Sequence, residues 1–160
     1  MMIAKREQGP VVVPWTFTDA SQVAVTAAPD LVDDPGQLHV VHIADCPSHP
    51  EIPDWSGSLV RQQYQECESR FREQICPHLP GNAEHLRLRF HVVHGRVASE
   101  VASFALRQRA SLIVLSSDNR SSVSRFVFGS RTSKIVHAAH CPVLVLKASM
   151  TGEMVFHARR

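Results

Sequence analysis

Apolar residues follow two alternating patterns along the chain. Short apolar runs rich in valine and isoleucine occupy residues 11–13, 38–43, 112–115 and 143–146. Runs of this length, bounded by Pro, Gly, Asp or Ser, are typical of strands buried on both faces of a sheet. Between them, apolar residues recur every three to five positions, as in an amphipathic helix. The pattern therefore predicts alternating strands and helices.

Capping residues support the same division. Thr18 precedes the first predicted helix and Ser58 precedes a long second one, and both are good N-cap residues. A third helix follows Gly95, and a fourth begins after Gly129. One more strand, in residues 86–93, alternates apolar residues with arginine and histidine, so we expect it nearer an edge of the sheet.

Five strands that alternate with helices require crossover connections, which are right-handed. This order predicts an α/β fold, with an open, Rossmann-like parallel sheet covered by helices on both faces. Residues 1–147 form the predicted domain, and residues 148–160 form a C-terminal tail that could take part in dimer contacts. A weak apolar pattern at Met154, Val155 and Phe156 would allow the tail to add an edge strand.

Composition excludes several classes of protein. The chain has 160 residues, of which 44% are hydrophobic and 20% charged, and this balance is typical of one globular domain. A net charge of +2 is too small to indicate a nucleic-acid or membrane-surface protein. The start, MMIAKREQGP, lacks the apolar stretch of a signal peptide, so we expect a cytoplasmic protein. The four cysteines form no CxxC pair, which favours reduced thiols.

The carboxyl edge of the predicted sheet is the expected place for a ligand, because ligands of open α/β sheets bind there. Several segments should meet at this edge, and a nucleotide would fit between them. They are the turn after the first strand (Pro14, Trp15, Thr16), the end of the second strand (Ile43), and the loop in residues 116–130.

The start of the fourth helix is a candidate anion site. Gly129 and Ser130 open a helix whose free N–H groups carry partial positive charge, and Arg131 adds a full charge beside them. Arg120 and Arg125 lie in the preceding loop. The alternative is that Gly-Ser is only a helix cap and that the arginines form a solvated face.

Four segments resemble the universal stress protein family, and together they span nearly the whole chain. They are VVVPWTFTDAS, LHVVHIAD, HGRVASEV and FGSRTSKIVHAAHCPVLVLK, of which the last is the most specific. The resemblance implies a Rossmann-like five-stranded sheet in the order 3-2-1-4-5. It also implies a homodimer that forms through the last strand, from Val143 to Leu146.

The ATP-binding branch of that family has the signature Gly, two residues, Gly, nine residues, Gly, and then Ser or Thr. In this chain it falls on Ser116, Asn119, Gly129 and Ser130, so the spacing is kept while the first two glycines are lost. The branch also has an acidic residue at the position of Thr16. The resemblance therefore implies an altered nucleotide site.

The family's glycine after the third strand is retained as Gly95. The cofactor-binding candidates are thus Pro14, Trp15, Thr16, Ile43, Gly95, Ser116, Asn119, Gly129, Ser130 and Arg131.

Other candidate chemistry is weaker. His137 and His140 lie three residues apart beside Cys141, but no four converging metal ligands can be traced. His42 and His94 fall near strand ends without a paired nucleophile or acid. We therefore expect no catalytic residue and no metal site.

These observations favour a universal stress-type protein that acts as a non-enzymatic stress-response or regulatory binding domain with a degraded nucleotide site. Its expected partners are a second copy of itself and proteins of unknown identity, rather than nucleic acid or membrane. The alternative is a member that binds ATP or AMP and hydrolyses ATP slowly; such an enzyme needs a carboxylate to hold metal near the phosphates, and the loop offers only Asp118.

Overall fold

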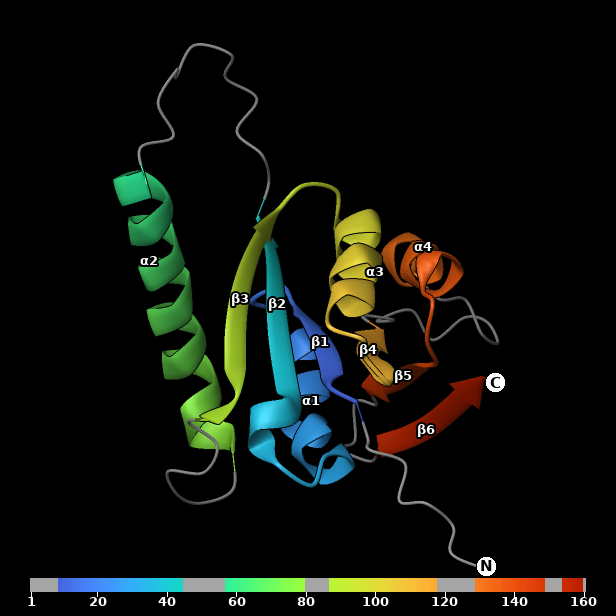
Figure 1. Cartoon of the computed structure of the whole chain (residues 1–160). Coiled ribbons are helices and arrows are strands. Elements are labelled where there is room, and N and C mark those ends of the chain that lie inside the picture. Colours follow the sequence, from blue (N-terminus) through green and yellow to red (C-terminus); the bar gives the residue numbers. More distant parts are fainter. Residues whose placement is uncertain (1–8, 45–56, 80–86, 118–128, 149–153, 160) are drawn as a thin grey trace, which may run out of the picture.

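A computed structural model describes residues 9–44, 57–79, 87–117, 129–148 and 154–159 of the chain. Strands and helices alternate as far as the fifth strand, and a sixth strand follows (Figure 1). The strands are β1 (Val11–Trp15), β2 (Leu38–Ala44), β3 (Arg89–His94), β4 (Leu112–Ser117), β5 (Val143–Ala148) and β6 (Met154–Arg159). The helices are α1 (Asp19–Ala27), α2 (Gly57–Ile75), α3 (Val97–Arg107) and α4 (Ser130–Ala138).

The strands form one sheet in the order β3-β2-β1-β4-β5-β6. β1 to β5 pair in parallel, and β6 pairs antiparallel with β5. The predicted α/β fold and its strand order 3-2-1-4-5 are confirmed. The extra strand predicted in the tail is also present, so this part of the tail belongs to the sheet.

The helices cover both faces of the sheet (Figure 1), and the sheet separates the core into two clusters. On one face, Val25 of α1 and Phe71 of α2 pack with the side chains of Val11, Val13 and Trp15 from β1. The opposite face holds a second cluster, in which residues of α3 and α4 pack over the remaining strand positions, among them Val12, Val101, Phe104 and Ile135. Successive residues of β1 therefore belong to different cores, as the period of a strand requires.

β1 and β4 separate at their carboxyl ends. They pair only at Val11 and Val12, whereas β1 stays paired with β2 as far as Trp15. Pro14 lies beyond the last residue that pairs with β4. Proline has no N–H group, and at this position none is needed for a bond to β4. The separation opens a crevice at the point where the strand order reverses direction, which is where such sheets bind ligands.

Two predicted boundaries differ from the structure. β3 begins at Arg89 rather than at residue 86, which lies outside the described residues, and it ends at His94. β3 does lie at an edge of the sheet, as its alternating pattern predicted. The long helix begins at Gly57, just before the expected cap Ser58.

An aromatic cluster joins α2 to the sheet. Phe71 is fully buried and stacks on Phe90 of β3, with 4.7 Å between the ring centroids. It also meets the edge of Trp15 at 5.0 Å. Ring contacts of this kind add to the free energy gained by burying apolar surface.

We therefore expect Phe71→Ala to lower the free energy of unfolding by about 3–5 kcal/mol, because it removes a large side chain and leaves a cavity. Urea unfolding followed by circular dichroism would measure this. Leu106→Ala is the matched control, since Leu106 is 58% exposed and its loss should change stability by less than about 0.5 kcal/mol. Equal effects of the two substitutions would contradict the role given to Phe71.

Candidate functional site: the crevice between β1 and β4

A pocket of about 270 Å³ lies in the crevice between the carboxyl ends of β1 and β4. The first turns of α1 and α4 complete its walls, and Val97 of α3 also reaches it. We call it the switch-point pocket. Its described lining is Pro14, Thr16, Thr18, Ala20, Ser21, Val97, Leu115, Ser116, Gly129, Ser130, Arg131, Thr132 and Ile135.

Several hydroxyl groups in this pocket are bonded within the chain. Thr18 caps α1 in a capping box with Ser21, and its Oγ1 lies 2.9 Å from Oγ1 of Thr16. The hydroxyl of Ser116 donates a short hydrogen bond to the backbone carbonyl of Ala20. This bond ties the end of β4 to α1. The Ser116 hydroxyl therefore has a partner on the protein where the ATP-binding signature has no side chain at all.

The start of α4 forms another wall. Gly129 is its N-cap residue and has no side chain that could accept a hydrogen bond from the first N–H groups of the helix. Gly129 has a φ of −53°, which any residue can adopt, and a Cβ added there would meet nothing within 4 Å. Among the described residues, neither backbone nor packing requires glycine here, and its effect there is to leave open space beside the helix start. Arg131 is exposed next to it.

The structure brings together six of the candidate residues predicted from sequence. Pro14, Thr16, Ser116, Gly129, Ser130 and Arg131 all line the switch-point pocket. Asn119, Arg120 and Arg125 lie outside the described residues, as does Asp118.

Three further candidates do not line this pocket. The side chain of Trp15 is 1% exposed and packs in the core beneath α1 and α2, because the strand period turns it away from its neighbours Pro14 and Thr16. Ile43 packs at the margin of the core beneath α3. Gly95 has a φ of +141°, and a Cβ there would lie 2.7 Å from Cγ of Glu100. The turn between β3 and α3 thus explains the glycine.

Sequence reasoning missed several wall residues. Thr18 is predicted only as the cap of the first helix, and Ser21 of α1 and Thr132 and Ile135 of α4 are not among the sequence candidates. They reach the pocket because α1 and α4 begin beside the crevice. The useful signal is that each crossover helix begins at the edge of the sheet where the preceding parallel strand ends, so its first turn lies near the ligand site.

The crevice and its walls define a Rossmann-like α/β domain with a ligand-sized pocket at the point where the strand order reverses. Residues 9–147 match the model of the universal stress protein family, and the chain belongs to this family.

Individual relatives agree with this assignment. The chain is 25% identical over 148 residues to Universal stress protein MJ0531 of Methanocaldococcus jannaschii. The matched segment covers 86% of this chain and 81% of the relative. Among solved structures, the universal stress protein UspA of Lactobacillus plantarum is similar with a TM-score of 0.59 and 22% identity, covering 86% of this chain and 97% of that one. A universal stress protein in complex with cAMP is similar with a TM-score of 0.52 and 17% identity, covering 89% and 98%.

The described part of the chain shows no group of three or more His, Cys, Asp or Glu side chains placed to hold a metal ion. Within the same described residues, no helix is both long and apolar enough to cross a membrane.

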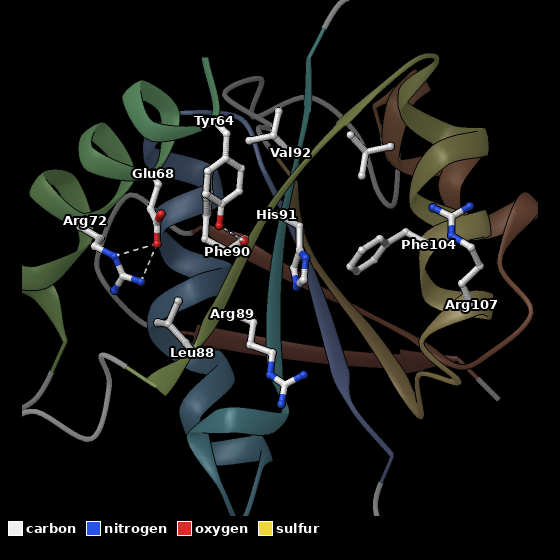
Figure 2. Close-up of a pocket in the computed structure, with 11 residues that line it drawn as sticks. Tyr64, Glu68, Arg72, Leu88, Arg89, Phe90, His91, Val92, Phe104 and Arg107 are labelled. Atoms are coloured by element: carbon white, nitrogen blue, oxygen red, sulfur yellow. Dashed lines mark hydrogen bonds and ion pairs between the residues drawn. The ribbon is translucent and has the colours of Figure 1, made fainter. Parts of the chain in front are cut away.

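A second cleft, of about 490 Å³, runs along β3 at the edge of the sheet (Figure 2). We call it the β3 groove. Its lining comes from β3, from α2 and from α3: Tyr64, Glu68, Arg72, Leu88, Arg89, Phe90, His91, Val92, Val93, Phe104 and Arg107. Sequence analysis did not identify this groove, because its two helical walls are far apart along the chain.

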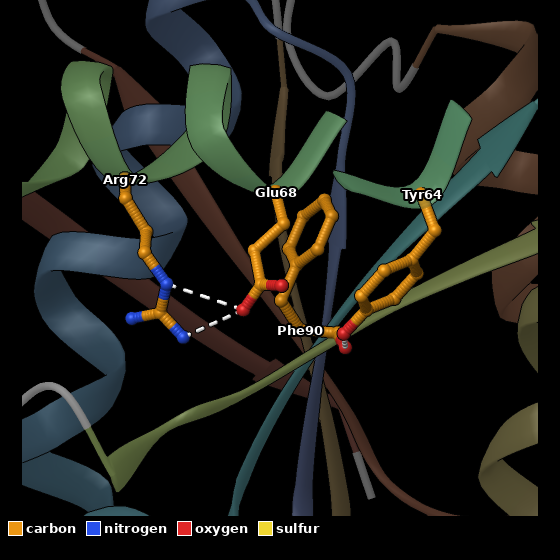
Figure 3. A network of polar contacts seen from close by, with 4 residues as sticks. All are labelled: Tyr64, Glu68, Arg72 and Phe90. Carbon is orange, nitrogen blue, oxygen red and sulfur yellow. Dashed lines mark hydrogen bonds and ion pairs between the residues drawn. The ribbon is translucent and has the colours of Figure 1, made fainter. Parts of the chain in front are cut away.

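The wall formed by α2 is held by polar contacts (Figure 3). The Tyr64 hydroxyl donates a hydrogen bond of 2.8 Å to the backbone carbonyl of Phe90. Arg72 donates from Nη2 and Nε to Oε1 of Glu68, at 2.8 and 3.2 Å. Burial and the nearby Glu68 carboxylate raise the pKa of Tyr64 above its usual value.

On the α3 side of the groove, two histidines stack beneath α3. The rings of His39 and His91 lie 5.1 Å apart, and His91 also contacts Phe104. Nδ1 of His39 and Nε2 of His91 are buried and have no hydrogen-bond partner among the described residues. Burial, together with the neighbouring His91 and Arg89, lowers the pKa of His39 to about 4. Burial also lowers the pKa of His91. Both rings are therefore neutral near pH 7.

This pair predicts a loss of stability in mild acid. The pKa of His39 is about 4 in the folded state against 6.5 for an exposed histidine, so the unfolded chain binds more protons between these values. Stability should fall as the pH drops through 6.5, and the loss should level off near pH 4. From pH 7 to pH 5 this one group should remove about 2 kcal/mol of unfolding free energy.

Urea unfolding at both pH values, for the wild type and His39→Leu, measures the effect as the difference between their pH slopes. We expect a shallower slope for His39→Leu. His78→Leu is the control, since His78 is exposed. Identical slopes for all three proteins would refute the assignment to His39.

Proposed function

We propose that this universal stress protein is a non-catalytic regulatory binding domain whose switch-point pocket does not hold ATP tightly. The observation that carries the proposal is the charge of the described lining, which contains Arg131 and no carboxylate. Magnesium beside a triphosphate is held by carboxylate and water oxygens. The described walls offer no such group for a metal-assisted hydrolysis, and a domain that signals by binding needs none.

Two further contacts support weak nucleotide affinity. Thr16 stands where an acidic residue would hold a nucleoside, and its hydroxyl is paired with that of Thr18. The hydroxyl of Ser116 is bonded to Ala20, and its side chain fills space that glycine would leave open. Each unmade polar contact costs about 1–3 kcal/mol of binding free energy.

A second candidate function is the binding of ATP or AMP. It is favoured by the open space beside Gly129 together with the exposed Arg131 guanidinium, which would make charge-assisted hydrogen bonds to a phosphate. The similar universal stress protein in complex with cAMP supports the same candidate.

We further propose that the protein forms a homodimer through the end of the sheet that contains Val143 to Leu146. In this chain, β6 already pairs with the outer side of β5. A second copy would therefore pair with β6 or take its place. Light scattering of the purified protein would establish the oligomeric state, and a monomer at all concentrations would refute the dimer.

Calorimetric titration with ATP, ADP and AMP in the presence of magnesium tests the pocket. We expect no saturation at micromolar ligand, and no hydrolysis of ATP. Saturable micromolar binding that Arg131→Ala abolishes would replace the first proposal by the second. Lys134→Ala is the matched control, because it removes an exposed positive charge from α4 without touching the pocket lining.

Restoring the missing groups should improve nucleotide binding. We expect the double substitution Thr16→Asp with Ser116→Gly to raise the affinity for ATP at least tenfold. The first change adds a polar contact and the second removes an obstructing side chain, and together they should improve the binding free energy by about 1.4 kcal/mol or more. The same titration measures the change, with the melting temperature as a check on folding. An unchanged affinity in a folded variant would show that these two positions do not limit binding.

A further inference from the structure

β3 is one end of the sheet, and no described strand pairs with its outer side. The hydrogen bond from Tyr64 shows which residues face outward, because the carbonyl of Phe90 points away from β2 to receive it. Backbone groups alternate along a strand, so the N–H and C=O of Val92 point outward as well. The opposite set points to β2, in agreement with the bond from Gly95 N–H to the carbonyl of Ala44. The Phe90 carbonyl keeps a second lone pair.

This outer side is the floor of the β3 groove, with α2 as one wall and α3 as the other (Figure 2). The two sides of the floor differ in chemistry because side chains alternate along β3. Leu88, Phe90 and Val92 pack toward α2 in an apolar cluster. Arg89 lies on the other face, with the exposed Arg107 on the α3 wall of the groove.

The charges on this floor are not balanced within the described structure. Arg72 is paired with Glu68, whereas Arg89 and Arg107 have no ion pair among the described residues. The α3 side therefore carries two positive charges that no described carboxylate pairs with. An anionic partner would complement them, and the complementary charge would favour both its association and its register.

We propose that the β3 groove binds an extended acidic segment of a partner protein, which adds to the sheet as a strand beside β3. Its backbone pairs with the outward N–H and C=O groups of Phe90 and Val92. Acidic side chains lie on the side of Arg89 and Arg107, and apolar side chains lie on the side of α2. The recognised segment therefore alternates acidic and apolar residues, and strand addition of this kind takes affinity from the backbone and specificity from alternate side chains.

The same charges argue against a second copy of this chain as the occupant. Pairing β3 with another β3 would bring two copies of the Arg89 and Arg107 cluster to one end of the sheet, with like charges close together. Charged residues on an edge strand also protect it from unselective pairing. Here they would exclude basic or neutral strands while accepting an acidic one.

Fluorescence anisotropy with a labelled, end-blocked peptide, Val-Glu-Val-Glu-Val-Glu, tests the proposal on the full chain. We expect saturable binding that weakens with salt, and none with Val-Lys-Val-Lys-Val-Lys. The double substitution Arg89→Glu with Arg107→Glu should weaken binding about tenfold or more, since it turns two attractive charge pairs into repulsive ones. Arg61→Glu is the control, because Arg61 is an exposed arginine of α2 outside the groove lining.

A second measurement separates strand pairing from simple charge attraction. Two peptide isomers, N-methylated either at every Val or at every Glu, block opposite edges of the added strand. One isomer should lose at least tenfold more affinity than the other, and bound peptide should slow amide exchange at Phe90 and Val92 in the full chain. Equal loss with both isomers, unchanged exchange, or unchanged binding by a folded Arg89→Glu, Arg107→Glu variant would overturn the proposal.

Discussion

The alternation of side chains along the central strand β1 is the constraint on which the rest of the structure depends. Val11, Val13 and Trp15 point into the core beneath α1 and α2, and Val12 points into the core beneath α3 and α4. The same alternation keeps Trp15 out of the switch-point pocket and leaves the neighbouring positions to line it. A shift of one residue in this strand would exchange the two sets and place an indole in the pocket. The two cores and the pocket are therefore determined together.

The two ends of the sheet expose different surfaces. At one end, β6 covers the outer side of β5 with backbone hydrogen bonds. At the other, β3 is flanked by α2 and α3 but has no described strand on its outer side. An open edge is a risk of aggregation unless charge or geometry restricts what can pair with it. Arg89 supplies the charge, and Tyr64 uses one lone pair of the outward carbonyl of Phe90 while the other is kept, so the edge is selective rather than closed.

Much of the fold could be predicted from the sequence, because strands buried on both faces give short valine-rich runs and the crossovers follow from their order. The pocket was predicted less completely. A run of consecutive residues such as Pro14, Trp15 and Thr16 looks like one unit in the sequence, yet a strand sends its middle member to the opposite face. Gly95 is a ligand candidate in the sequence, and the structure shows that the turn between β3 and α3 requires a glycine there in any case. The β3 groove had no local signal, since its walls meet only after folding.

The switch-point pocket combines the frame of a ligand site with hydroxyl groups that are already bonded within the protein. The frame consists of the separation of β1 from β4 and the start of α4 beside it, and both are present. The second feature is that protein groups satisfy hydroxyls on the pocket wall. Ser116 bonds to Ala20, and Thr16 pairs with Thr18, so the protein supplies contacts that a ligand would otherwise make. A ligand must break such bonds or bind without them, and either course lowers its affinity. Because the Ser116 bond also joins β4 to α1, the residue at this position contributes to the fold as well as to the wall of the pocket.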